Sequence, residues 1–226
     1  MVLLVVLVVN ILIAPAVTSI QAPRHPNFGA ALMLASFTAL VVAAAVATSH
    51  GRAARYLALG IGAPALVLAW PGIFSDRSVL IGLSYACNVV FLALVIVLLV
   101  RQVFRARTVT LDVISASLCA YLLIGLAWAS AYGLIELWQP DSFRMPEDGF
   151  PAFVAQHIDS VVRRVYFSFV TLLTLGYGDV VPASSIARLS TVIEAFVGQV
   201  FLVVLIARLV GIQVGQEMST PPSSET

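Results

Sequence analysis

The sequence predicts an all-α membrane protein, and three observations lead to this prediction. Apolar residues make up 61% of the 226 positions, while charged residues account for only 10%. The mean hydropathy is +1.03, and several apolar segments are long enough to cross a bilayer as helices. A soluble domain of this length cannot bury so much apolar surface, so we expect the chain to expose it to lipid.

The predicted spans divide into four N-terminal helices and two helices nearer the C-terminus. They are Val2–Ser19, Phe28–Thr48, Tyr56–Phe74, Val79–Val100, Val113–Leu137 and Ile186–Val210. The first span lacks a positively charged start, which favours a retained helix over a secretory signal. The small residues around Pro15 leave cleavage at this point open as an alternative.

The arginines predict how the spans are oriented. All twelve basic residues are arginine, and five of them lie in the connecting loops Ser49–Arg55 and Arg101–Leu111. Short loops rich in arginine stay on the cytoplasmic side of a membrane. With six spans, this places both the N-terminus and the C-terminus in the cytoplasm.

The fourth span, Val79–Val100, contains no charged residue. A voltage sensor needs arginines that recur inside the membrane, where each one moves through part of the potential. The arginines at the end of the span, Arg101, Arg105 and Arg107, fit anchors at the cytoplasmic surface better. We therefore predict that residues 1–107 form a four-helix region without a voltage-sensor arginine array.

The stretch Val170–Pro182 reads VTLLTLGYGDVVP and contains two glycines separated by one residue. A cation that enters an apolar medium loses its hydration shell, and backbone carbonyls can replace those oxygens without titrating. Successive carbonyls can point to one side only if the strand leaves ordinary φ/ψ space at intervals, which glycine allows at the least steric cost. Gly176 and Gly178 lie at such intervals. An ordinary glycine-rich turn is the alternative.

The hexapeptide Thr174–Asp179, TLGYGD, resembles TVGYGD, the selectivity filter of potassium channels. The resemblance implies that four residues coordinate K⁺ through their oxygens: Thr174, Leu175, Gly176 and Tyr177. It also implies that Gly178 and Asp179 complete the outer turn. One such loop cannot encircle an ion, so the family resemblance implies a homotetramer.

Residues 108–214 resemble the pore module of small bacterial potassium channels. After the fifth span this module contains a polar outer loop, Gln139–His157, and a re-entrant pore helix, Ile158–Leu173, followed by the filter and the last span. Channel relatives often carry aromatic residues at the positions of Phe167 and Phe169. The resemblance implies that these rings support the filter as a cuff.

In the last span, Gly198 lies twenty residues after Gly178. This spacing resembles that of the gating-hinge glycine in many potassium channels, although close helix packing explains the residue equally well. If Gly198 is a hinge, three side chains are expected to face the central cavity: Gln199, Leu202 and Ile206. Residues 215–226 are predicted to form a short cytoplasmic tail.

Glu194 is the carboxylate that lies well inside the last span. An ionisable group in the membrane is costly to bury and therefore suggests a function. The side chain could line the cavity, or it could hydrogen-bond to the back of the pore helix near Ser168 or Thr171. We favour the hydrogen bond.

These patterns predict a potassium-selective channel subunit that conducts passively. A non-conducting structural or regulatory membrane subunit and a weakly selective cation channel are the alternatives. No catalytic triad or metal-ligand spacing indicates an enzyme, and we expect no cofactor other than K⁺ as the permeant ion. The expected partners are K⁺, the lipid bilayer and further copies of the chain, and the net charge of +1 gives no reason to expect nucleic acid. The resemblance suggests the inner (plasma) membrane of a bacterium.

Overall fold

The computed structural model describes residues 4, 5, 7, 8, 78–144 and 160–219. The first three predicted spans lie wholly or largely outside these residues, as does most of the predicted outer loop. The described part is mostly helical, and three of its helices are long and apolar enough to cross a membrane. The predicted class, a helical membrane protein, is confirmed for this part of the chain.

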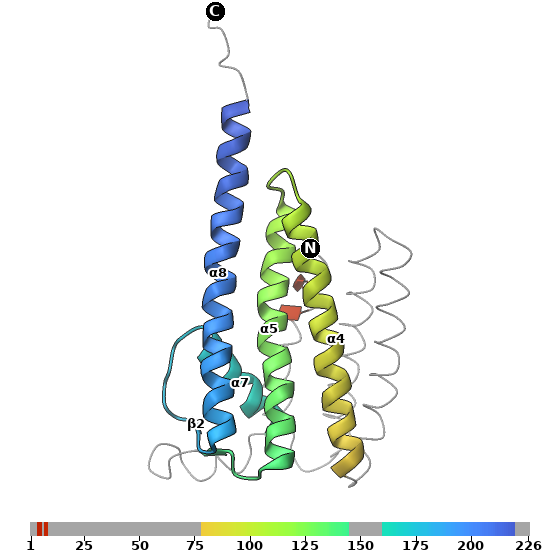
Figure 1. The fold of residues 1–226 in the computed structure, drawn as a ribbon, viewed down its shortest axis with the longest axis vertical. Helices are drawn as coiled ribbons and strands as arrows, with labels where there is room; N and C mark the ends of the chain where they lie inside the picture. The colour runs from red at the N-terminus through yellow and green to blue at the C-terminus, as the bar shows by residue number, and fades with distance from the viewer. Residues whose placement is uncertain (1–3, 6, 9–77, 145–159, 220–226) are drawn as a thin grey trace, which may run out of the picture.

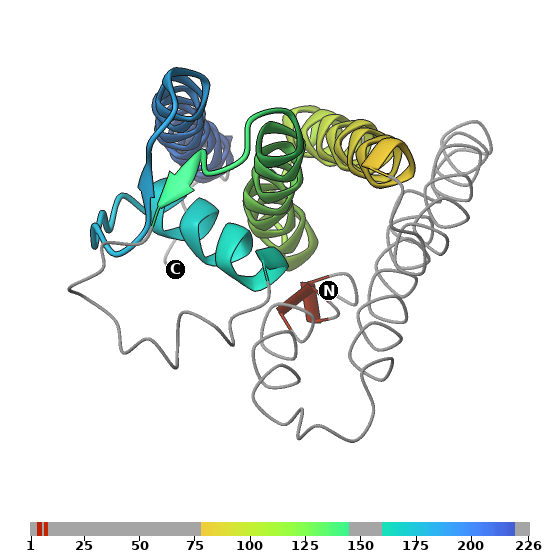
Figure 2. The same ribbon diagram turned by 90° about the horizontal axis from the view of Figure 1, so that it is seen from below.

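The three long helices are α4 (Ser78–Arg105), α5 (Leu111–Trp138) and α8 (Ser185–Ser219). They run side by side, and α5 lies between the other two (Figures 1 and 2). They correspond to the predicted fourth, fifth and sixth spans. Both ends of α4 and α5, and the start of α8, lie within five residues of the predicted boundaries. The end of α8 lies farther from its predicted position.

Helix α8 extends nine residues past its predicted end at Val210. Residues 215–219, predicted to belong to a tail, are therefore helical. Gly211 and Gly215 weaken a helix but do not block it, which is why the pattern looked finished earlier than it is. The next proline is Pro221, and a helix usually ends at or before the residue preceding a proline.

The turn between α4 and α5 is short, and α5 begins with a well-formed N-terminal cap. Thr110 is extended, with φ −120° and ψ 162°, and its side chain accepts a hydrogen bond from the backbone N–H of Val113. Asp112 in the first turn adds a negative charge where the helix dipole favours one. The two helices lie side by side as an antiparallel pair (Figure 1).

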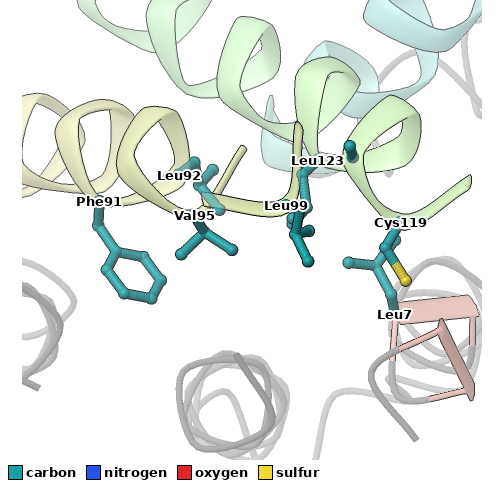
Figure 3. Close-up of a cluster of buried hydrophobic side chains, with 8 residues drawn as sticks. Leu7, Phe91, Leu92, Val95, Leu99, Cys119 and Leu123 are labelled. Carbon is teal, nitrogen blue, oxygen red and sulfur yellow. The ribbon is translucent and has the colours of Figure 1, made fainter. Parts of the chain in front are cut away.

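The interface of α4 and α5 holds the largest buried apolar cluster of the described residues. Phe91, Val95 and Leu99 recur every four residues along one face of α4 and belong to the same cluster as Cys119 and Leu123 of α5 (Figure 3). Leu7 packs into the same cluster. Cys119 is buried as a free thiol, as expected for a small core residue.

A short helix, α7 (Ser160–Leu172), crosses the face of the α5 and α8 pair (Figure 2). Its thirteen residues make a helix of about 20 Å, which is too short to span a bilayer. It lies within two residues of the predicted pore helix at both ends. The polypeptide after it returns to α8 through the TLGYGD segment.

Two short strands, β1 (Phe143–Arg144) and β2 (Val181–Pro182), pair in antiparallel register. Phe143 lies opposite Pro182, and Arg144 lies opposite Val181. The sequence analysis predicted no strand at either place, because two-residue strands leave no alternating pattern and proline disfavours a strand. The pairing ties the chain after α5 to the chain that follows the glycine-rich segment.

Candidate functional site

The backbone of the glycine-rich segment alternates in conformation. Thr174, Gly176 and Gly178 have φ angles of 56°, 60° and 76°. A positive φ at every second residue lets successive peptide units turn their carbonyls toward one side, as a carbonyl-lined ion filter requires. The two glycines were predicted to adopt this conformation. Thr174 was missed in this respect, because a threonine with positive φ is uncommon.

The same segment lies on the surface of the subunit. The side chains of Leu175 and Tyr177 are 49% and 66% exposed, whereas Leu172 before them and Val180 after them are buried. A Cβ atom added at Gly176 or Gly178 would meet nothing within 4 Å. The backbone of the segment is thus accessible to a ligand or to another chain.

The start of the segment is hydrogen-bonded to the end of α7. The backbone N–H of Thr174 donates to the carbonyl of Thr171 at 3.0 Å, and that of Leu175 donates to the carbonyl of Val170 at 2.9 Å. These bonds use carbonyls that would otherwise be unpaired at a helix C-terminus. The orientation of α7 therefore determines the position of Thr174.

The outer end of the segment is held by Tyr166 on α7. Its hydroxyl donates a hydrogen bond to Asp179, and the other carboxylate oxygen of Asp179 accepts from the backbone N–H of Val180 at 2.9 Å. Partial burial and the adjacent carboxylate raise the pKa of Tyr166 to about 12. The phenol therefore stays protonated and able to donate at physiological pH. No pattern in the sequence indicated this role for Tyr166.

An aromatic cluster holds α7 against α5 and β1. The ring centroid of Phe167 lies 5.3 Å from that of Tyr132 and 5.1 Å from that of Phe143. Phe169 lies at the place where Gly125 of α5 leaves room for its ring. The two predicted cuff residues thus contact α5 and β1. They hold α7, which leads into the TLGYGD segment, against these two elements.

A tyrosine of α5 reaches the C-terminal end of α7. The hydroxyl of Tyr121 donates to the backbone carbonyl of Leu172 at 2.9 Å, and this bond is buried. It pairs one of the last carbonyls of the helix, which would otherwise lack a partner. Tyr121 was not singled out in the sequence, because its apolar surroundings resemble those of any core residue.

Glu194 of α8 is fully buried and lies against α7 and α5. It hydrogen-bonds with the hydroxyls of Ser168 and Tyr132. The hydrogen bond to Ser168 is one of the two arrangements that the sequence left open, and the structure shows it. Tyr132 was missed as a partner.

Gly198 of α8 lies against the end of α7. A Cβ atom at this position would come within 2.7 Å of Leu172 Cδ1, so the glycine allows a close approach of the two helices. Gln199 and Ile206 are exposed, as residues facing a cavity would be in a single subunit. Leu202 instead packs against the cluster of Tyr121, Ile124 and Leu172, and so lies on the packed side of α8.

Charged residues at the start of α7 bind the end of α5. Glu136 accepts hydrogen bonds from Arg163 at 2.8 Å and from Arg164 at 2.7 Å. Arg164 also donates to the hydroxyl of Tyr85 on α4 at 2.5 Å. These contacts hold the start of α7 on the α4–α5 pair, and the bond from Tyr121 to Leu172 holds its end on α5.

Comparison with known proteins agrees with this geometry. Residues 145–213 match the sequence model of a family described as Ion channel. A stretch of 49 residues is 47% identical to part of the Two-pore potassium channel 4 of Arabidopsis thaliana. This stretch makes up 22% of this chain and 17% of that protein. No solved structure gives a match. Residues 145–213 are thus similar to an ion-channel domain, and three of the described helices are long and apolar enough to cross a membrane.

Proposed function

We propose that the protein is a subunit of a potassium-selective channel and that the segment Thr174–Asp179 is its filter. The observation that carries the proposal is the positive φ at Thr174, Gly176 and Gly178 in an exposed TLGYGD segment. The ion-channel family match and the partial similarity to a plant potassium channel support it.

In the proposed mechanism, K⁺ exchanges its hydration shell for oxygens of the filter. Carbonyls of Leu175, Gly176 and Tyr177 and oxygens of Thr174 replace the water ligands, so that entry into the membrane costs little. The C-terminal end of α7 leads directly into the filter at Thr174. Its partial negative charge favours a cation in front of it. The ion then moves down its electrochemical gradient.

We propose a homotetramer, because one filter segment cannot surround an ion. The segment is exposed in a single subunit, and so is one long apolar face of α8. This face includes Leu189, Val192, Phe196, Val203, Ile206 and Val210. A water-filled pore, lipid and the neighbouring copies would share this surface. The TLGYGD segment of each copy would then face a common axis.

We propose that the filter opens to the outside and that both termini are cytoplasmic, in the plasma membrane of a bacterium. The turn between α4 and α5 lies at the opposite end of the helices from β2 (Figure 1). That turn carries Arg105 and Arg107, and arginine-rich turns remain in the cytoplasm. This orientation places the filter end outside.

The proposal is tested by measuring ⁸⁶Rb⁺ or K⁺ uptake into vesicles that contain the purified full-length protein. The variant Gly176→Ala forces a side chain onto a residue with φ of 60°, and we expect it to abolish uptake. The matched control is Gly211→Ala, because an added Cβ there meets nothing within 4 Å and alanine favours a helix. Equal uptake by both variants would contradict the proposal.

A further inference from the structure

Glu194 brings three helices together at one buried point. Its own helix is α8, Ser168 belongs to α7, and Tyr132 belongs to α5. All three residues are buried, and Glu194 and Tyr132 have no exposed surface. The carboxyl group is therefore shielded from water by the protein itself.

The hydrogen bonds at this point can all be made together if the carboxyl group is protonated. Ser168 Oγ contacts Glu194 and also lies 2.7 Å from the carbonyl oxygen of Gly125. The Tyr132 hydroxyl supplies the hydrogen for the other oxygen of Glu194. A carbonyl can only accept, and a serine hydroxyl has one hydrogen to donate. If Ser168 gives that hydrogen to Gly125, the hydrogen between Ser168 and Glu194 has to come from Glu194.

The charges around the site lead to the same protonation state. Among the described residues, the arginines on the helices that pack around Glu194 are engaged elsewhere. Arg163 and Arg164 bind Glu136, Arg188 donates to the carbonyl of Pro182, and Arg208 donates to Phe104 and Ala106. Thr191, which precedes Glu194 on α8, gives its hydrogen to Ala187 at 2.8 Å. An ionised carboxylate here would lack a counter-ion, and burying an unpaired charge is strongly unfavourable.

The contact between Glu194 and Ser168 is linked to the filter segment through α7. Ser168 lies in the last three turns of α7, and the carbonyls of Val170 and Thr171 in the same helix bind the first residues of the filter segment. A change in the distance between α7 and α8 at Glu194 would therefore move Thr174. The contact lies behind the filter segment, so Glu194 itself does not touch the ion.

We propose that Glu194 carries a proton and, as a neutral acid bonded to Ser168 and Tyr132, is the positioning residue that holds α7 and the filter on α8. The link to the filter rests on the proposed function. The assignment of the proton rests on the contacts of the side chain alone.

Infrared difference spectroscopy of the full-length protein in lipid vesicles tests the proton. The spectrum of wild type minus Glu194→Gln is expected to show the C=O stretch of a carboxylic acid at neutral pH. Tyr132→Phe should shift this band to higher frequency, because the C=O group loses its hydrogen-bond donor. The matched control is Glu136→Gln, since Glu136 binds two arginines and should show only carboxylate bands. Carboxylate bands alone for Glu194 would overturn the assignment.

Hydrogen exchange over residues 160–172 tests the positioning role separately. A glutamine amide can donate to Ser168 while its oxygen accepts from Tyr132, so Glu194→Gln should leave exchange and K⁺ uptake unchanged. Glu194→Leu removes both contacts and should accelerate exchange in α7 and reduce uptake. Unchanged exchange in Glu194→Leu would overturn the positioning role. If the wild type conducts no K⁺, the proposed function fails, while the infrared and exchange results still decide this inference.

Discussion

The side chain of Leu172 occupies the space that the missing Cβ of Gly198 leaves open. Leu172 is fully buried at the end of α7, and a Cβ at Gly198 would lie 2.7 Å from its Cδ1 atom. Its carbonyl oxygen accepts the hydrogen bond from Tyr121. The last residue of α7 is therefore fixed from both α5 and α8, two residues before the TLGYGD segment begins at Thr174.

Gly198→Ala is expected to destabilise the protein by about 1–3 kcal/mol, because the added methyl group overpacks a filled site. Thermal unfolding of the assembled protein measures this loss. Adding Leu172→Ala should relieve most of the clash, and the double variant separates packing from bending. If the double variant regains stability but the proposed channel still does not open, Gly198 also acts as a hinge. If Gly198→Ala alone has no effect, the packing account is wrong.

Tyr166→Phe keeps the ring and removes the donor to Asp179, and it should lower K⁺ over Na⁺ selectivity. Because the pair is partly exposed, we expect a stability loss of only about 1 kcal/mol. Denaturation at increasing pH checks the origin of this loss. The pKa of Tyr166 rises from 10 to about 12 in the folded protein, so the bond contributes fully below pH 10 and is lost as pH approaches 12. A difference between wild type and variant that persists at pH 12 would contradict this account.

The two arginines that bind Glu136 should differ in their importance. The side chain of Arg164 is 7% exposed and that of Arg163 is 28% exposed. Arg164→Gln breaks a buried pair and should cost about 3 kcal/mol, whereas Arg163→Gln should cost at most about 1 kcal/mol. Thermal unfolding of both variants in the same detergent gives the comparison. Equal losses would show that burial does not determine the strength of this contact.

Arg208 joins α8 to the turn between α4 and α5. It donates to the carbonyls of Phe104 at 3.0 Å and Ala106 at 3.1 Å, where the end of α4 favours a cation. Arg208→Met should therefore speed amide exchange at Ala106, whose N–H bonds to Val103 at 3.2 Å. Arg188→Met serves as the control, because Arg188 lies at the other end of α8 and binds Pro182. Equal exchange at Ala106 in both variants would show that Arg208 does not hold the turn.

Much of the fold of the described residues could be predicted because the lipid environment leaves a strong pattern in the sequence. Long apolar runs predicted α4, α5 and α8, and the short run before the TLGYGD segment predicted α7. The end of α8 was misplaced, because Gly211 and Gly215 interrupt the apolar pattern after Val210. The β1–β2 pair was missed, since its two-residue strands form through contacts distant in sequence.

The TLGYGD segment was identified from its residues as the candidate filter, and the positive φ at Gly176 and Gly178 followed from glycine chemistry. The residues that support the motif were harder to find. Tyr121, Tyr132 and Tyr166 each reach their partners across the fold, over separations of 51, 62 and 13 residues. A tyrosine in an apolar run looks the same whether or not its hydroxyl has a partner, so sequence alone could not select these three.

The reversal potential of the purified full-length protein in planar bilayers tests potassium selectivity most directly. One side holds high potassium with low sodium and the other side holds the reverse, and current is recorded from wild type, Gly176→Ala and the control Gly211→Ala. We predict that wild type and Gly211→Ala reverse near the K⁺ equilibrium potential and that Gly176→Ala carries no selective current. A wild-type reversal midway between the K⁺ and Na⁺ potentials would contradict a potassium-selective filter at Thr174–Asp179.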